Sequence, residues 1–226
     1  KVVIARETCN LSYSVVESYV AHVLSLGVLQ SLYTICFTVP FLLLLGPEGE
    51  YKYFFAIFLA LSLVGSVHGF LVGTVARSFP HAQLMLVTTT IPMLLFSGFL
   101  IQESAVSPPL LPFWYSSYYR YAFQGVVSNE FRGRTFDHCS EAQFRKFKCP
   151  FGIGSVETSA VLRALDMQHE RTADNVNVLL LFLTAMVAAG LTLMPATFDG
   201  ANKMVPPAPG ACDEMPVVVP DDAAAV

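Results

Sequence analysis

Residues 53–76 read YFFAIFLALSLVGSVHGFLVGTVA, more than twenty positions without one Asp, Glu, Lys or Arg. Three further stretches have the same property, and they lie at 18–47, 78–102 and 175–198. The hydrocarbon core of a bilayer requires about 20 consecutive apolar residues from a helix, and each charge at its centre costs roughly 2.5–3.5 kcal/mol. The four stretches therefore predict an all-α integral membrane protein.

The composition of the whole chain agrees with this class. Hydrophobic residues make up 54% of it and charged residues only 13%, and the mean hydropathy is +0.56. A soluble domain carries roughly 25% charged residues to keep its surface wet, so a soluble helical protein with four such stretches is the weaker alternative. The net charge of −4 and the absence of an arginine-rich run argue against a nucleic-acid partner.

Breaks between the uncharged stretches divide the chain into spans and connections. The three spans within 19–102 are expected at about 19–45, 53–76 and 82–102, and the last span at 176–195, where Pro195 ends it. Residues 1–18 are expected to form a short cytosolic segment. Residues 196–226, rich in Pro, Ala, Val and Asp, are expected to form a disordered cytosolic tail.

Basic residues in the short connections predict the orientation of the chain. An even number of spans places both termini on one side, and Lys and Arg in short loops favour the cytosol. The basic residues on the terminal side are Lys1, Arg6, Arg77 and Lys203. The opposite short loop contains only Lys52, so both termini are predicted to be cytosolic and the loop 103–175 to face outward or into a lumen.

The long loop contains two unusual features. Cys139 and Cys149 are predicted to form a disulfide in an oxidising compartment; two free thiols, or half of a metal site with His138, are the alternatives, but zinc needs four ligands and no second pair is present. Residues 105–131 are rich in Tyr, Phe and Trp yet broken by prolines. That composition indicates a re-entrant or interfacial helical hairpin, with a fifth full span as the alternative.

The predicted spans contain three regularly spaced glycines and two histidines. Gly65, Gly69 and Gly73 are four positions apart, a spacing that lets another helix approach closely, although glycine is also simply common in membrane helices. His68 could relay protons, but no span contains a carboxylate, so it is interpreted as a neutral, hydrogen-bonded packing residue, and so is His22.

Pro92 interrupts the third span after Thr88-Thr89-Thr90 and should bend it. The bulky apolar residues beyond the bend could form either a packed seam or a constriction. No P-loop and no H-E-x-x-H or G-x-S-x-G motif is present. The chain is therefore predicted to have no catalytic, cofactor-binding or metal-binding residue, to be no enzyme by itself, and to take its energy from another polypeptide or domain.

Several short motifs, taken in order, resemble the membrane domain of the G (white/brown) subfamily of ABC transporters. Arg6-Glu7 followed by Tyr13-Ser14 is similar to the segment before the third helix of that family. Phe96-Ser97-Gly98 resembles the end of its helix five, and 119–131, containing Tyr119-Arg120-Tyr121 and Asn129-Glu130-Phe131, resembles the stretch that opens its outer loop. The resemblance covers roughly residues 5–195.

This resemblance implies helices three to six of a six-helix ABC-2 type domain, with a disulfide-containing outer loop. Arg6, Glu7 and Tyr13 would couple the helices to an upstream ATPase domain that holds ATP and Mg. The implied substrate-cavity residues are Ile91, Leu94 and Leu95, and the implied apolar plug is Phe99 and Leu100. The chain departs from the family in lacking a proline at Val28-Leu29-Gln30, in lacking a glycosylation triplet in the outer loop, and in its acidic, proline-rich tail.

The implied function is the transmembrane part of an ATP-driven exporter of lipids, sterols or other hydrophobic compounds. It would work by alternating access as a homo- or heterodimer of half-transporters, in contact with membrane lipid and in the plasma membrane. The alternative is a non-transporting scaffold or receptor-like subunit whose outer loop binds a partner. A secondary transporter is disfavoured because no intramembrane carboxylate is available for ion coupling.

Overall fold

The computed structural model describes residues 14–76, 78–101, 103–131, 135–136, 156–157, 162, 165, 167 and 171–202. Its elements, in chain order, are α2 (Val15–Leu45), α3 (Tyr51–Val75), α4 (Phe79–Leu95), the 3₁₀ turns η1 (Glu103–Ala105) and η2 (Pro108–Leu110), α5 (Leu111–Ser116), α6 (Tyr118–Phe131), β1 (Thr135–Phe136), β2 (Val156–Glu157) and α9 (Thr172–Asn202).

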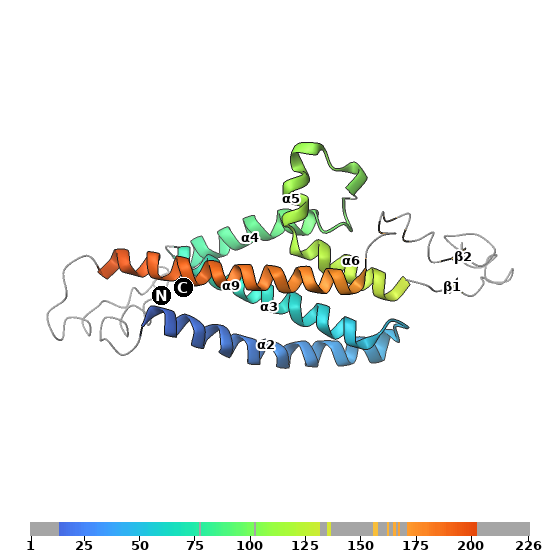
Figure 1. The fold of residues 1–226 in the computed structure, drawn as a ribbon, viewed down its shortest axis with the longest axis horizontal. Helices are drawn as coiled ribbons and strands as arrows, with labels where there is room; N and C mark the ends of the chain where they lie inside the picture. The colour runs from blue at the N-terminus through green and yellow to red at the C-terminus, as the bar shows by residue number, and fades with distance from the viewer. Residues whose placement is uncertain are drawn as a thin grey trace, which may run out of the picture.

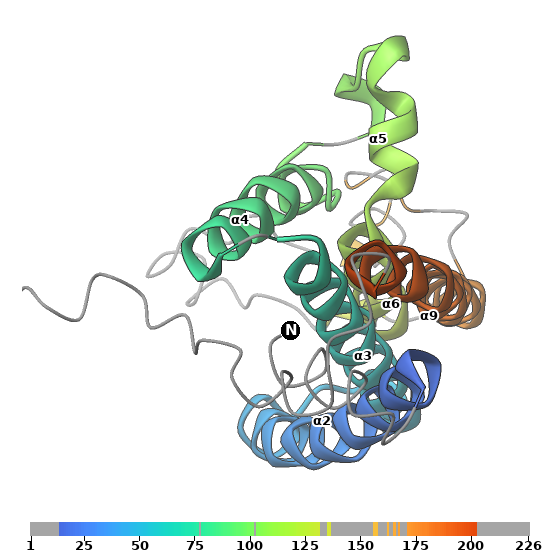
Figure 2. The ribbon, with the colours of Figure 1, turned by 90° about the vertical axis from the view of Figure 1, so that its left-hand side faces the viewer.

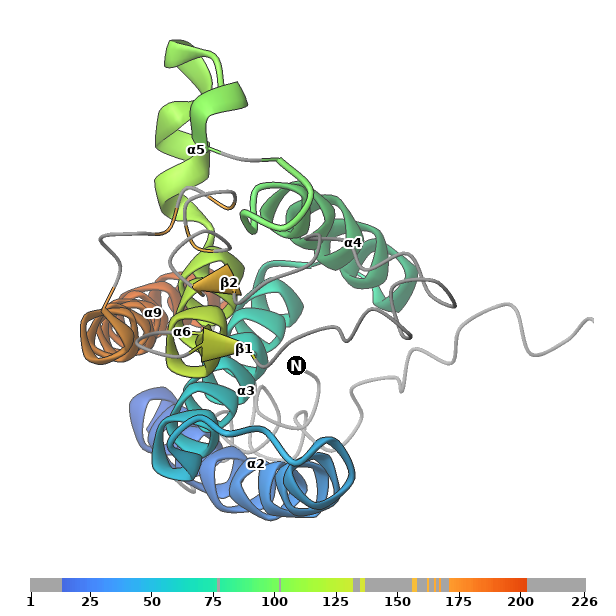
Figure 3. The same cartoon turned by 90° about the vertical axis from the view of Figure 1, so that its right-hand side faces the viewer.

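Three long helices, α2, α3 and α9, run side by side along the molecule (Figure 1). Each contains a segment long and apolar enough to cross a bilayer, and these segments are Val15–Leu45, Tyr51–Val75 and Thr172–Pro195. The all-helical membrane class predicted from the sequence is confirmed at this level. The strands β1 and β2 form only a two-residue antiparallel ladder beside the end of α6 (Figure 3).

Helix α2 begins four residues earlier than predicted because Ser14 and Glu17 form a capping box. The Ser14 hydroxyl accepts a hydrogen bond from the first turn, and the Ser14 backbone N–H donates to Glu17 Oε2 at 2.8 Å. The helix ends at Gly46, whose φ of 55° is left-handed and whose N–H donates to the Leu42 carbonyl at 3.1 Å. The short loop that contains Lys52 in the sequence analysis follows, and α3 begins at Tyr51.

The predicted third span, 82–102, is wrong in length. Helix α4 has 17 residues and ends at Leu95, so it extends only about 25 Å, less than the hydrocarbon core of about 30 Å. Pro92 weakens its last turn because it lacks an N–H, and Gly98, with a φ of 86°, turns the chain away. The apolar residues up to Ile101 therefore lie in a turn rather than in a helix.

Helix α9 is longer than the predicted span 176–195. It begins at Thr172 and passes through Pro195 to Asn202. A proline inside a helix removes one backbone hydrogen bond, and here this does not stop the helix. The first seven residues of the predicted disordered tail are thus helical, and 203–226 lie outside the described residues.

Helix α3 lies at the centre of the bundle, with α2, α4, α6 and α9 around it (Figure 2). Its buried residues Ile57, Ala60 and Val64 form one apolar cluster with Tyr118 and Ala122 of α6 and with Leu179 of α9. The aromatic segment 105–131 folds into α5 and α6. Helix α6 packs on α3 and α9, whereas α5 projects from the bundle (Figure 1).

A close contact at Tyr19 and Gly190 joins α2 to α9. The Tyr19 ring is fully buried, and its hydroxyl donates to the Val187 carbonyl at 3.1 Å. A Cβ atom added at Gly190 would overlap this ring. Because residue 190 is a glycine, the Tyr19 ring fits between the two helices. Small residues at such contacts let membrane helices pack closely, and close packing holds them together where no hydrophobic driving force acts between them.

Replacing Gly190 with alanine should destabilise the protein by about 1–3 kcal/mol, because the new methyl group displaces the Tyr19 ring. The measurement is thermal unfolding of the purified full chain in detergent. Gly65→Ala is the matched control, since a Cβ there meets nothing within 4 Å. Equal unfolding temperatures for the two variants would contradict the close contact.

Candidate functional site

An apolar groove of about 310 Å³ lies between α3, the end of α4 and α6. Almost all of its wall is aliphatic or aromatic. The lining residues are Ile57, Phe58, Leu61, Leu94, Ser97, Phe99, Tyr119, Ala122, Phe123 and Val126. A groove with this lining favours apolar or amphipathic molecules, since a polar ligand would find few hydrogen-bond partners in it.

Two of the five predicted transport residues line this groove. Leu94 and Phe99 belong to it, whereas Ile91 and Leu95 lie on α4 outside its wall and are 52% and 42% exposed. Leu100 is 58% exposed and also lies outside the wall. The predicted cavity set (Ile91, Leu94 and Leu95) and the predicted plug (Phe99 and Leu100) thus each contribute one residue to the groove.

Phe99 reaches the groove because the left-handed turn at Gly98 directs the chain back toward α6. Its ring meets the Phe123 ring edge-on, with centroids 5.6 Å apart and an interplanar angle of 71°. The Phe99 side chain nevertheless remains 68% exposed. An aromatic edge contact of this kind contributes about 0.5–1.5 kcal/mol beyond burial, so it orients the ring without fixing it firmly.

Helix α4 is attached to the bundle mainly by polar contacts, because none of its residues is buried. The Thr89 hydroxyl pairs with His68 Nε2 at 3.3 Å, and His68 Nδ1 pairs with the Tyr118 hydroxyl at 3.2 Å. The Ser117 hydroxyl donates at 2.6 Å to the carbonyl of Met93, one of those that a helix end leaves unpaired. His68 is thus a hydrogen-bonded packing residue, as interpreted from the sequence.

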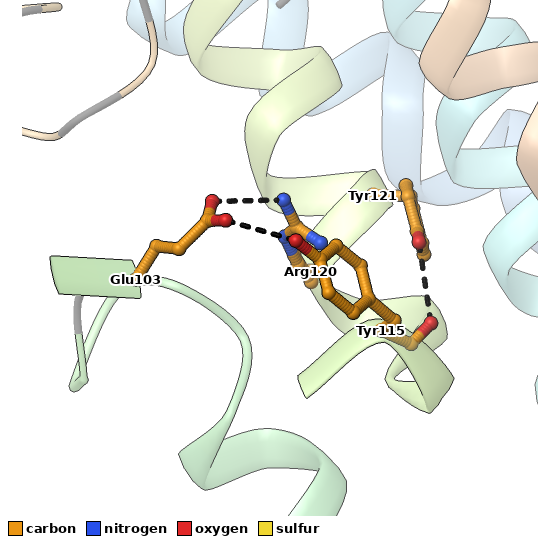
Figure 4. Close-up of polar contacts among 4 residues, drawn as sticks. All are labelled: Glu103, Tyr115, Arg120 and Tyr121. Carbon is orange, nitrogen blue, oxygen red and sulfur yellow. Dashed lines mark hydrogen bonds and ion pairs between the residues drawn. The ribbon is translucent and has the colours of Figure 1, made fainter. Parts of the chain in front are cut away.

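Arg120 forms a second polar centre, at the junction of α5 and α6 (Figure 4). Only 4% of this residue is exposed, and its Nη2 lies 3.3 Å from Glu103 Oε2. The guanidinium also lies 4.9–5.3 Å from the ring centroids of Trp114, Tyr115 and Tyr121. A buried cation needs this combination of a carboxylate and aromatic faces to offset its lost hydration.

Glu103 ties the 3₁₀ turn η1 to this centre. Its Oε1 accepts a hydrogen bond from the Tyr115 hydroxyl at 3.0 Å (Figure 4), and this bond together with the carboxylate charge raises the pKa of Tyr115. The Tyr121 hydroxyl donates to the Tyr115 carbonyl at 3.2 Å. Sequence analysis named Arg120 only as part of the family motif and did not pair it with Glu103. The signal that could have predicted this pair is that Glu103 and Arg120 are the only charged residues in the stretch 103–121.

The Asn129-Glu130 motif at the end of α6 holds the α2–α3 connection. The Glu130 carboxylate accepts the N–H groups of Glu48 and Gly49 at 3.2 and 3.0 Å, and Asn129 Nδ2 donates to the Glu50 carbonyl at 3.1 Å. A Cβ at Gly49 would lie only 2.6 Å from Asn129 Nδ2, so glycine is required for this approach. Sequence analysis recognised the motif but not its partner.

The remaining predicted residues do not join the groove. A Cβ added at Gly65, Gly69 or Gly73 meets nothing within 4 Å, so no described segment packs closely on the glycine ladder. Arg6, Glu7, Tyr13, Cys139 and Cys149 lie outside the described residues. Within the described part of the chain, no three His, Cys, Asp or Glu side chains are grouped to hold a metal ion.

The three long apolar helices define a multi-pass integral membrane protein. The sequence model of the ABC-2 type transporter family matches residues 1–131, more than half of the 226 residues. The chain belongs to this family. The family implies that it is the transmembrane part of an ABC exporter, which works with an ATPase partner. The match ends at Phe131, after the Asn129-Glu130 motif.

The pair Glu103–Arg120 should show strong energetic coupling. Glu103→Gln leaves the buried Arg120 charge without its carboxylate, and we expect a loss of about 1.5–3 kcal/mol. A double-mutant cycle with Arg120→Gln, read by thermal unfolding in detergent, measures the coupling. The exposed pair Glu50–Lys52, whose side chains are 61% and 70% exposed, is the control and should show no measurable coupling. Similar coupling free energies for the two pairs would contradict the expectation that burial strengthens the Glu103–Arg120 interaction.

Glu130→Gln should loosen the α2–α3 connection, because an amide replaces one of the two acceptor oxygens with a donor. Hydrogen exchange of the Glu48 and Gly49 amides should become about tenfold faster, the loss of one hydrogen bond to a charged group. Glu17→Gln, which alters the cap at the opposite end of α2, should leave these two amides unchanged. Unaltered exchange in the Glu130 variant would rule out the clamp.

Proposed function

We propose that this chain moves lipids, sterols or other hydrophobic compounds as part of an exporter of the G (white/brown) subfamily. The observation that supports this cargo is the groove beside Leu94 and Phe99, whose wall is almost entirely aliphatic and aromatic. Such a wall favours cargo that is itself apolar over at least part of its surface.

The proposed mechanism is alternating access driven by ATP. An ATPase domain, on the same or another polypeptide, binds ATP with Mg and hydrolyses it; this chain has no catalytic role of its own. Two half-transporters work as a dimer, and Arg6, Glu7 and Tyr13 pass the closure of the ATPase domains to the helices. Both termini are cytosolic and the protein resides in the plasma membrane.

Helix α4 is the element best suited to move during this cycle. It has no buried residue, and a few hydrogen bonds and Met93 attach it to the bundle. Breaking such contacts costs far less than opening the packed cluster of α3, α6 and α9, since each hydrogen bond contributes only about 0.5–1.5 kcal/mol net. A shift of α4 would widen or close the groove beside Leu94 and Phe99.

Phe99→Ala in the complete transporter should change ATP-dependent uptake of a hydrophobic probe into inverted membrane vesicles by several-fold, because it removes one aromatic side chain from the wall of the groove. The vesicles are tested with a panel of lipids, sterols and drugs. Leu44→Ala, at a position 84% exposed near the end of α2, is the matched control and should transport normally. Wild-type transport by the Phe99 variant at equal expression would overturn the assignment of the groove.

A further inference from the structure

Two polar attachments of α4 meet at the start of α6. The Ser117 hydroxyl donates to the Met93 carbonyl at 2.6 Å. The Tyr118 hydroxyl lies 3.2 Å from His68 Nδ1, and His68 Nε2 lies 3.3 Å from the Thr89 hydroxyl. Thr89 and Met93 are four residues apart and therefore lie on the same face of α4. Two consecutive residues thus hold one face of α4, the first directly and the second through a histidine of α3.

The directions of these hydrogen bonds assign one tautomer to His68. The Thr89 hydroxyl donates its only proton to a carbonyl of its own helix, that of Met85 at 3.0 Å or that of Leu86 at 3.1 Å. The Thr89 oxygen is then the acceptor for an N–H at His68 Nε2. Because a neutral imidazole has a single N–H, Nδ1 is the acceptor for the Tyr118 hydroxyl. We call the three residues Tyr118, His68 and Thr89 the latch.

The surroundings of the latch keep His68 neutral. The segments 18–45, 53–76, 79–95 and 175–198 of the helices that surround it contain no Asp, Glu, Lys or Arg. On α6, Arg120 is bound to Glu103. A second proton on His68 would therefore add a buried charge without a carboxylate to offset it. The latch is thus an attachment between helices that needs no ionised group.

The latch is the weaker of the two attachments. Its two bonds, at 3.2 and 3.3 Å, are at the upper end of the range for hydrogen bonds, whereas the bond from Ser117 to Met93 is short at 2.6 Å. A shift of a few tenths of an ångström breaks a bond that is already long. The latch should therefore open first, while α4 remains attached at Met93.

The next residue of α6 brings the latch into contact with the apolar groove. Tyr119 lines the groove, and its ring packs on the Tyr118 ring with centroids 4.5 Å apart and planes inclined by 32°. Tyr118 is only 1% exposed. A close-packed interior leaves such a ring little free space, so it moves when its neighbour moves. Displacement of Tyr119 from the groove side would therefore shift the hydroxyl that Tyr118 donates to His68.

We propose that His68 is a positioning residue that couples occupancy of the groove to the attachment of α4. A molecule that fills the groove displaces Tyr119 and Tyr118, the latch opens at Thr89, and α4 becomes free to pivot at Met93. An empty groove leaves the latch closed. The identity of the occupant as cargo rests on the proposed transport function, whereas the coupling is a property of the folded chain.

Hydrogen exchange of the α4 amides measures the latch without transport. The purified full chain is placed in lipid nanodiscs and exchange is followed by mass spectrometry, since the exchange of a segment reports its local opening. Thr89→Val removes the acceptor of the His68 N–H, and exchange within 79–95 should become about threefold to tenfold faster, the range for one hydrogen bond. Thr89→Ser keeps the hydroxyl and should retain slow exchange. Peptides of α9 should be unchanged in both variants.

A double-mutant cycle tests the coupling to the groove. Tyr119→Ala removes the ring that packs on Tyr118 and should accelerate α4 exchange about threefold to tenfold. In a His68→Leu background the latch is already absent, so Tyr119→Ala should have no further effect. Tyr118→Phe removes only the hydroxyl donor and provides a second background with the same expectation. Phe123→Ala is the matched control, because Phe123 lines the same groove but contacts Phe99, and its effect should be equal in all backgrounds.

The opposite results would overturn the proposal. Unchanged α4 exchange in Thr89→Val, or equally fast exchange in Thr89→Ser, would show that the hydroxyl does not hold α4. An undiminished effect of Tyr119→Ala in both backgrounds would show that the groove influences α4 by another route. These measurements use neither cargo nor an ATPase, so a failure of the exporter assignment would leave them valid, and a failure of the latch would leave that assignment standing.

Discussion

Lipid provides no hydrophobic force to hold helices together, so this bundle depends on close packing and on hydrogen bonds at the places where helices end. Helix α3 satisfies the first requirement. It buries Ile57, Ala60 and Val64 against α6 and α9 and carries most of the core. The second requirement is met by side chains that reach backbone groups of distant segments, as Glu130 does at Gly49 and Ser117 at Met93. Both the packing and the hydrogen bonds depend on the central position of α3, which contacts α2, α4, α6 and α9.

The distribution of these contacts separates a firm part of the molecule from a loosely held one. Helices α3, α6 and α9 share buried apolar side chains, and Tyr19 joins α2 to α9 across Gly190. Helix α4 has no buried residue and is attached mainly through the hydrogen bonds of Thr89 and Ser117. In the proposed transport cycle, a helix attached in this way would shift beside the apolar groove without disrupting the core.

Helix α6 connects the apolar groove to two polar anchors. Its residues Phe123 and Val126 form part of the groove, Arg120 binds Glu103, and Glu130 accepts the Gly49 N–H. One helix of 14 residues thus contributes to the groove and to both anchors. A change in the position of α6 would therefore alter the groove and both polar anchors, because a short helix with many contacts moves as a unit.

The sequence by itself determined the membrane class, the positions of the three long helices and the family, because the cost of placing charge in hydrocarbon leaves uncharged stretches and the motifs occur in order. It could not determine that α4 stops at Leu95, that α9 continues past Pro195, or that Leu94 and Phe99 share a groove without Leu100. Nor could it pair Glu103 with Arg120 or Glu130 with the Gly49 amide. Those features depend on contacts between residues far apart in the chain, which only the packing of helices on α3 brings together.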